Sequence, residues 1–184
     1  MSLDGQHLAV GTDEGREAVI WVYDLAGGSA IRRLTLGGRN RYPVWSSDGQ
    51  RIAFQSDRDK DLAIWWQRAD GTGMAERLTK PDPGTEHVPD SMSPRGDRLL
   101  DIVKDSAWSL WTLSLPDKTL TPFGNAQSRF PTAAVFSPNG QWVAYATTEQ
   151  AGQPDIRAAV PSGWFAVRDP RKSWRPTASS LVVP

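Results

Sequence analysis

Short apolar runs alternate with turn dipeptides along most of the chain. Between Pro43 and Thr79, for example, the apolar runs are separated by Asp48-Gly49 and by Asp70-Gly71. Gly readily adopts the positive φ that tight turns require, and Asp tolerates the left-handed region. This pattern predicts a meander of short antiparallel strands.

The same pattern occurs four times, around turn glycines that are 44, 47 and 44 residues apart: Gly5, Gly49, Gly96 and Gly140. An apolar strand follows each glycine. The first three copies continue with a second strand that carries a Trp, such as Ile64-Trp65, and a short closing strand such as Leu78-Thr79. A period of about 40–50 residues that holds four strands is typical of a β-propeller blade.

The strands are apolar on both faces, as in Ile20-Trp21-Val22-Tyr23. Such strands fit sheets that are stacked between neighbours on both sides. A β-sandwich, the alternative, predicts half-polar strands and no fixed period. We therefore predict an all-β fold, a β-propeller of four-stranded antiparallel blades with about three and a half blades per chain. The predicted blades span about residues 2–35, 43–79, 89–121 and 131–156.

The phrase Pro-x-Trp-Ser-x-Asp-Gly-x-x-Ile-Ala-Phe, followed by Ile-Trp and Leu-Thr, resembles the TolB-type (PD40-type) repeat of WD40-like β-propellers. Similar repeats occur in the propeller regions of bacterial serine/threonine kinases and of prolyl-oligopeptidase-like peptidases. The resemblance covers residues 2 to about 156 and implies a propeller, apparently a fragment. In such proteins the propeller binds protein or gates a separate hydrolase domain.

The pattern breaks after Ile156. Residues 157–184 carry five basic residues and one acidic residue, a net charge of +4, whereas residues 1–156 carry a net charge of −4. Restoring two lost nucleotides after the Ile156 codon gives Ile-Tyr-Val-Gln-Pro-Phe-Pro-Pro-Gly in one choice of codons. We therefore interpret 157–184 as a basic tail and hypothesise that it is frame-shifted.

An incomplete ring leaves sheet faces and edges bare. Self-association to a homodimer would complete it if the segment Ala133–Phe136 of one chain joined the first blade of its partner. Each chain would then contribute three blades, and the strand after Gly140 would be displaced. The alternative is that the tail covers the open side of the same chain.

Composition excludes several classes of function. The 21 basic and 21 acidic residues balance, so no overall field indicates a nucleic-acid or membrane partner. There is no Cys, which removes thiolate chemistry. No apolar run reaches about 18 residues, and the first residues do not form a signal peptide. Localisation therefore stays open between the bacterial cytoplasm for this chain and the periplasm for a parent protein.

Catalytic and metal motifs are also missing from the sequence. The sequence has two histidines, His7 and His87, but no Gly-x-Ser-x-Gly motif that could supply the nucleophile of a catalytic triad. The segment Asp57–Asp61 has carboxylates at alternate positions, as a calcium loop does, but Arg58 and Lys60 lie between them and the following Gly is absent. We expect a charged hairpin loop, no cofactor and no enzyme activity.

The loops that enter each new blade contain the candidate binding residues. They read Asn40-Arg41-Tyr42-Pro43, Glu86-His87-Val88-Pro89 and Ser128-Arg129-Phe130-Pro131. In a propeller these loops lie around one mouth of the central channel, where binding usually occurs. Arg41, His87 and Arg129 would form a partial ring of donors for a carboxylate or phosphate. The alternative is that these three side chains pair with acidic neighbours.

We therefore expect a non-catalytic module that binds a protein or peptide through Arg41, Tyr42, His87, Arg129 and Phe130. One alternative is a propeller fragment of a prolyl-oligopeptidase-like peptidase without its hydrolase domain. The other is a truncated gene piece with no selected function. The recurring Trp21, Trp65 and Trp111 are expected to pack between blades.

Overall fold

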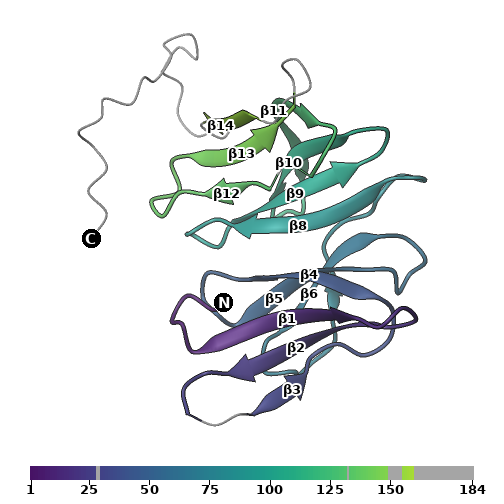
Figure 1. Cartoon of the computed structure of the whole chain (residues 1–184), viewed down its shortest axis with the longest axis vertical. Helices are drawn as coiled ribbons and strands as arrows, with labels where there is room; N and C mark the ends of the chain where they lie inside the picture. Colours follow the sequence, from purple (N-terminus) through teal and green to yellow (C-terminus); the bar gives the residue numbers. More distant parts are fainter. Residues whose placement is uncertain (28–29, 132, 149–154, 160–184) are drawn as a thin grey trace.

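The computed structural model describes residues 1–27, 30–131, 133–148 and 155–159. These residues form four antiparallel sheets that follow one another in space in the order of the sequence (Figure 1). The first sheet holds β1 (His7–Asp13), β2 (Ala18–Asp24) and β3 (Ile31–Arg33). The second holds β4 (Asn40–Trp45), β5 (Arg51–Ser56), β6 (Ala63–Arg68) and β7 (Glu76–Arg77). The third holds β8 (Glu86–Met92), β9 (Arg98–Lys104), β10 (Trp108–Ser114) and β11 (Leu120–Ser128), and the fourth holds β12 (Val135–Phe136), β13 (Val143–Thr147) and β14 (Asp155–Ala159).

Within each sheet every strand pairs with the next strand of the chain. This is the connectivity of propeller blades, and the predicted all-β fold of stacked antiparallel blades is confirmed. Strand β14 continues to Ala159, beyond the predicted end of the repeats at residue 156. The rest of the proposed tail lies outside the described residues. In the part of the chain that the structure describes, no helix could span a membrane.

A serine explains why each turn forms where the repeat places it. In the second sheet Ser46 Oγ donates to Asp48 Oδ1 at 2.6 Å and accepts the Arg51 N–H at 2.9 Å. Gly49 then turns the chain with φ of 68°. Ser2 with Asp4, and Ser137 with Asn139, make the same contact between side chains. The recurring Ser-x-Asp-Gly phrase therefore builds the turn between the inner two strands.

Side chains from successive sheets interdigitate in three apolar clusters. Because direction alternates along a strand, Ile52 and Phe54 point toward the first sheet, whereas Ala53 points toward the third. A third cluster joins the third sheet to the fourth through residues such as Leu100 and Val143. Full burial of a side chain such as Phe54 contributes about 1.5–3 kcal/mol at most. The core thus lies between the sheets.

Candidate functional site

The prediction that the first two entry segments are loops is wrong, because Asn40 to Pro43 lie in β4 and Glu86 to Pro89 lie in β8. These parts of the two inner strands come together with Pro131 and Ala133, which precede β12. The register of β4 on β5 shifts between Arg41 and Val44, and that of β8 on β9 shifts between Pro89 and Ser91. Both shifts fall at the recurring Pro, because Pro has no N–H to donate and is placed at bulges. At these bulges β4 and β8 line a shared space.

This space is a cavity of about 310 Å³, which we call the entry-loop cavity. Its lining is mostly apolar and aromatic, with one carboxylate. The lining residues are Tyr42, Pro43, Val44, Val88, Pro89, Asp90, Ile102, Trp108, Pro131 and Ala133. A cavity of this size and lining is suited to an apolar side chain or a short peptide segment.

Two residues of the entry-loop cavity have unusual backbone conformations. Tyr42 has φ of 54° and Ala133 has φ of 43°, in a region that residues other than Gly adopt at a cost of about 1–3 kcal/mol. The Tyr42 side chain is nevertheless about half exposed, at 52%. Strain that presents an aromatic ring to solvent beside a cavity is typical of binding sites.

Asp90 supplies the one carboxylate of the cavity. It accepts a hydrogen bond from the Ala134 N–H through Oδ2. Burial raises the pKa of Asp90 above its ordinary value, and the Ala134 hydrogen bond opposes this only in part. Through its hydrogen bond to Ala134, Asp90 of β8 connects the cavity lining to the residues that precede β12.

Arg41 does not point into the entry-loop cavity. Its Nε and Nη2 donate to Asp13 Oδ2 of β1 at 2.9 and 2.5 Å, and Arg39 lies 3.3 Å from the other carboxylate oxygen. The Arg41 hydrogen bond is the main reason why the pKa of Asp13 is lowered. Arg41 therefore joins the second sheet to the first, as the acidic-neighbour alternative expects.

His87 is buried, with 4% of its surface exposed, and points away from the entry-loop cavity. Its Nδ1 lies 2.7 Å from Oδ2 of Asp101, which is fully buried in β9. Burial raises the pKa of the Asp101 carboxyl, although the contact with His87 acts in the opposite direction. His87 and Arg41 thus both contact carboxylates rather than forming an open ring of donors.

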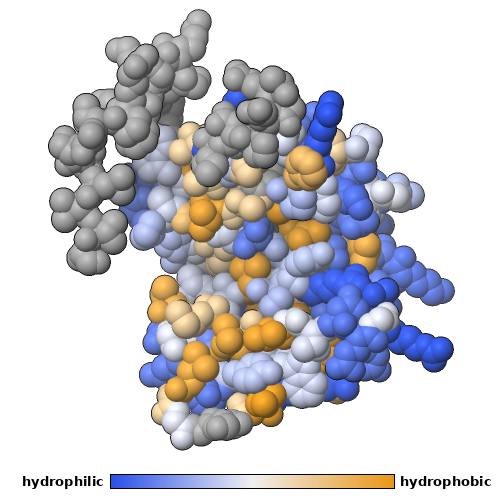
Figure 2. Space-filling view, in the orientation of Figure 1, coloured by the Kyte–Doolittle hydropathy of each residue, from blue (hydrophilic) through white to orange (hydrophobic). Residues whose placement is uncertain are grey.

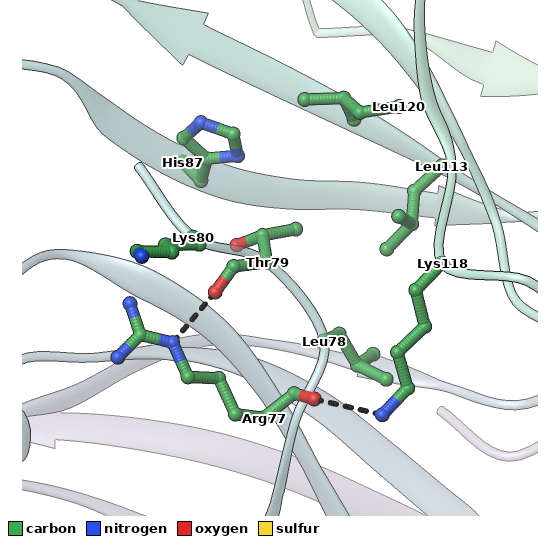
Figure 3. Close-up of a pocket in the computed structure, with 8 residues that line it drawn as sticks. All are labelled: Arg77, Leu78, Thr79, Lys80, His87, Leu113, Lys118 and Leu120. Carbon is green, nitrogen blue, oxygen red and sulfur yellow. Dashed lines mark hydrogen bonds between the residues drawn. The ribbon is translucent and has the colours of Figure 1, made fainter. Parts of the chain in front are cut away.

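His87 instead lines a second cavity of about 500 Å³ between the second and third sheets (Figure 3). Arg77 and Lys118 face this cavity and donate to the carbonyl oxygens of Thr79 and Arg77 at 2.7 and 3.2 Å. Arg77 also pairs with Asp59 and Asp61, and Lys118 pairs with Glu76. The charges of Arg77 and Lys118 are therefore already balanced by the chain's own carboxylates.

Arg129 and Phe130 lie at the entry to the fourth sheet. Both are exposed, and their backbone N–H groups donate to Thr148 Oγ1 at 2.9 Å and to Ser128 Oγ at 3.2 Å. Neither residue lines the entry-loop cavity, although Pro131 does. A role of Arg129 and Phe130 in binding stays a prediction.

The carboxylates of the segment from Asp57 to Asp61 point to different partners. Asp57 accepts the Arg39 N–H at 2.6 Å, whereas Asp59 and Asp61 both contact Arg77. Within the described residues, no group of three or more acidic or histidine side chains is arranged to hold a metal ion. Of the tryptophans, Trp65 is buried between the first two sheets, and Trp21 and Trp111 are half-buried.

The sequence analysis did not identify Asp90 and Trp108, which line the entry-loop cavity, or Asp101, which contacts His87. The repeat could have indicated Asp101, because the residue five positions after the turn glycine is apolar in the other three copies. Trp108 carried no such signal. It lines the entry-loop cavity from β10, far from the loops in sequence.

The sheets and their connectivity define a class of protein, the β-propellers. No family model and no curated protein matches the chain. Among solved structures, a putative TolB from Agrobacterium tumefaciens superposes with a TM-score of 0.72 at 20% identity, over 86% of this chain and 56% of that chain. TolB from Acinetobacter baumannii superposes with a TM-score of 0.68 at 24% identity, over 89% and 42%. A prolyl endopeptidase superposes with a TM-score of 0.67 at 17% identity, over 88% and 26%.

The fold is accordingly that of a TolB-like propeller, and the predicted resemblance is confirmed at the level of the fold. The chain spans about half of the length of the two TolB proteins. Identities below 25% establish the fold alone, so the activities of these proteins do not transfer to this chain.

Proposed function

We propose that the chain is a non-catalytic module that binds an extended protein or peptide segment at the entry-loop cavity. The observation that carries this proposal is the convergence of β4, β8 and the residues before β12 on one apolar cavity rimmed by the strained, exposed Tyr42. The segment would insert an apolar side chain between Trp108 and the loop prolines. Tyr42 would cover it from the rim, because Tyr combines a large apolar surface with a polar tip.

The test is selection of peptides on the folded chain from a displayed random library, followed by measurement of their affinities by calorimetry. We expect Tyr42→Ala to weaken the selected peptides by at least about tenfold, the loss typical of an aromatic anchor. Met74→Ala is the matched control, because Met74 is 94% exposed and does not line the cavity. Peptides that bind equally well to both variants would refute the proposal.

Arg41 and Arg129 are tested in the same assay. If the peptide carboxylate contacts them, Arg41→Ala and Arg129→Ala each weaken binding, and the loss shrinks at high salt because exposed charges are screened. Arg41→Ala also frees Asp13 from its partner, so Asp13→Ala serves as the control for loss of that ion pair. Unchanged affinity in both Arg variants would remove them from the site.

A second candidate function is favoured by the similarity to a prolyl endopeptidase. In this case the chain would be the propeller part of a peptidase and would control access to a hydrolase domain. A Gly-x-Ser-x-Gly coding region adjoining the gene, in frame with it, would support this candidate. A kinase-coding region in that place would refute it.

A further inference from the structure

Exposed apolar side chains occur on the first and fourth sheets, the two ends of the row of four sheets. Leu8, Leu25 and Ile31 are exposed on or beside the first sheet, and Val135 and Trp142 are exposed on the fourth. Figure 2 shows apolar surface over the first sheet, at the lower end of the molecule. A cluster of exposed apolar side chains of this kind generally marks an interaction surface.

Comparison of the four copies of the repeat shows that one face of the first sheet has no covering sheet among the described residues. The residue three positions after the turn glycine is Leu8, Ile52, Leu99 or Val143 in the successive copies. The last three are 0% exposed, and each packs against the sheet that precedes its own. Leu8 is 36% exposed, because no described sheet precedes the first. Tyr23 and Ile31 lie on this same face as cross-strand neighbours of Leu8, and we call it the leading face.

Among the described residues, no sheet covers the opposite face of the fourth sheet. Ala144, paired with Val135, points away from the third sheet, and Trp142 shares this orientation because it is two residues away. The equivalent of Ala144 in the second sheet, Ala53, is 1% exposed and packs against the sheet that follows. Val135 and Trp142 are instead 54% and 47% exposed. We call this the trailing face.

We infer that two copies of the chain stack head to tail, with the leading face of each copy against the trailing face of the other. The chain already makes this kind of contact three times between its own sheets, so both halves of the interface are encoded in its repeat. Two different faces meet in each contact, and a rotation of 180° that makes both contacts at once closes the two copies into a two-fold ring.

Two copies are the number that the size of the fold favours. The chain superposes on 56% of the Agrobacterium TolB chain, so two sets of four sheets suffice for a propeller of that size. Stacking also requires no exchange of strands. Strand β12 is already paired with β13, and Phe136 is 7% exposed in the cluster with the third sheet. The contact therefore adds to the sheets without displacing any.

Sedimentation velocity of the full chain over a range of concentrations tests the proposal. We expect a reversible species of twice the 20.3 kDa of one chain. Leu8→Lys on the leading face and Trp142→Lys on the trailing face should each raise the dissociation constant by at least about tenfold, because each buries an unpaired charge. Met74→Lys, at an exposed apolar residue of the second sheet's loop, is the matched control.

Mixing distinguishes the head-to-tail contact from other dimers. In a mixed dimer, one of the two contacts joins the intact trailing face of the Leu8→Lys chain to the intact leading face of the Trp142→Lys chain, whereas in the dimer of either variant alone both contacts carry a Lys. Because the mixed dimer keeps one intact contact, an equimolar mixture should associate more than either variant alone. In a symmetric contact between two leading faces, Trp142→Lys would have no effect and mixing would restore nothing. That result, or a wild-type chain that stays monomeric at every concentration, would overturn the proposal. A dimer that does not dissociate on dilution would indicate strand exchange instead.

Discussion

Asp101 lies at a position that is apolar in the other copies of the repeat, where Val10, Phe54 and Tyr145 occur. It is fully buried and contacts His87. A buried carboxylate gains little net stability from such a contact, because the cost of removing its charge from water offsets the attraction. The raised pKa of Asp101 is consistent with this cost.

This feature predicts a dependence of stability on pH. Because the folded pKa of Asp101 is raised, the folded chain holds a proton that the unfolded chain has lost. The stability of the wild type relative to Asp101→Asn should therefore be greatest near pH 4 and should fall as pH rises, by up to about 1.4 kcal/mol per pH unit. Urea unfolding between about pH 4 and pH 6 measures it, below the ordinary pKa of histidine.

Asp105→Asn is the control for which the opposite pH dependence is expected. The pKa of Asp105 is lowered, mainly by the Ala107 N–H, so the wild type should gain stability relative to this variant as pH rises to about 4, measured in a series extended to about pH 2, and this difference should stay constant above about pH 4. If Asp101→Asn shows the same sign as Asp105→Asn, Asp101 is ionised in the folded chain without penalty, and the interpretation is wrong.

At the level of the strand, a threonine explains why the closing phrase of the repeat reads Leu-Thr. Thr79 Oγ1 accepts the Ile64 N–H at 2.9 Å, and Thr35 Oγ1 accepts the Ile20 N–H at 3.0 Å. Both threonines are buried. Each hydroxyl thus satisfies the backbone of the strand that precedes the short closing strand, β6 before β7 and β2 before β3, where the closing strand diverges from it.

Thr79→Val should therefore destabilise the chain by about 1–3 kcal/mol, since it leaves the buried Ile64 N–H without an acceptor. Thr79→Ser, which keeps the hydroxyl and loses only a methyl group, should cost less than Thr79→Val. Chemical denaturation followed by Trp fluorescence measures both. Equal losses in the two variants would show that packing, rather than the hydrogen bond, selects Thr at this position.

The strands and turns could be predicted from the sequence, whereas the contacts of the side chains of Arg41 and His87 could not. Each repeat contains its own turn, such as Ser46-x-Asp48-Gly49, so local residues determine where strands begin and end. The direction of Arg41 and His87 depends instead on bulges at Pro43 and Pro89, which shift the register. Trp108 reaches the cavity from another strand, and nothing local to the loops indicates it.

For the whole molecule, the four sheets differ in how well they are covered. The second and third sheets have neighbours on both sides, and their inner residues in β5 and β9 are buried almost throughout. Strand β1, at the same place in the repeat, is half-buried or exposed along its length. Regions with fewer buried contacts open at lower free energy, so stability should decrease from the middle of the arc to its first sheet.

Hydrogen exchange monitored by mass spectrometry tests this gradient. In the monomeric Leu8→Lys variant, amides of β1 should exchange at least about tenfold faster than those of β5 and β9. In the wild type at high concentration, β1 should become more protected as the leading face is covered. Met74→Lys should behave as the wild type does. Uniform protection of β1, β5 and β9 in the monomer would contradict the gradient.

Strand packing between sheets joins only sheets that are neighbours in the sequence, among the described residues. Each sheet therefore presents the same two kinds of face to whatever precedes and follows it. If the gene gains or loses one whole repeat in frame, the sheets on either side of the change still present faces that pack together. An insertion of another length inside a sheet would disrupt that packing. A gene of this kind can change length in steps of one blade and still encode a chain that folds.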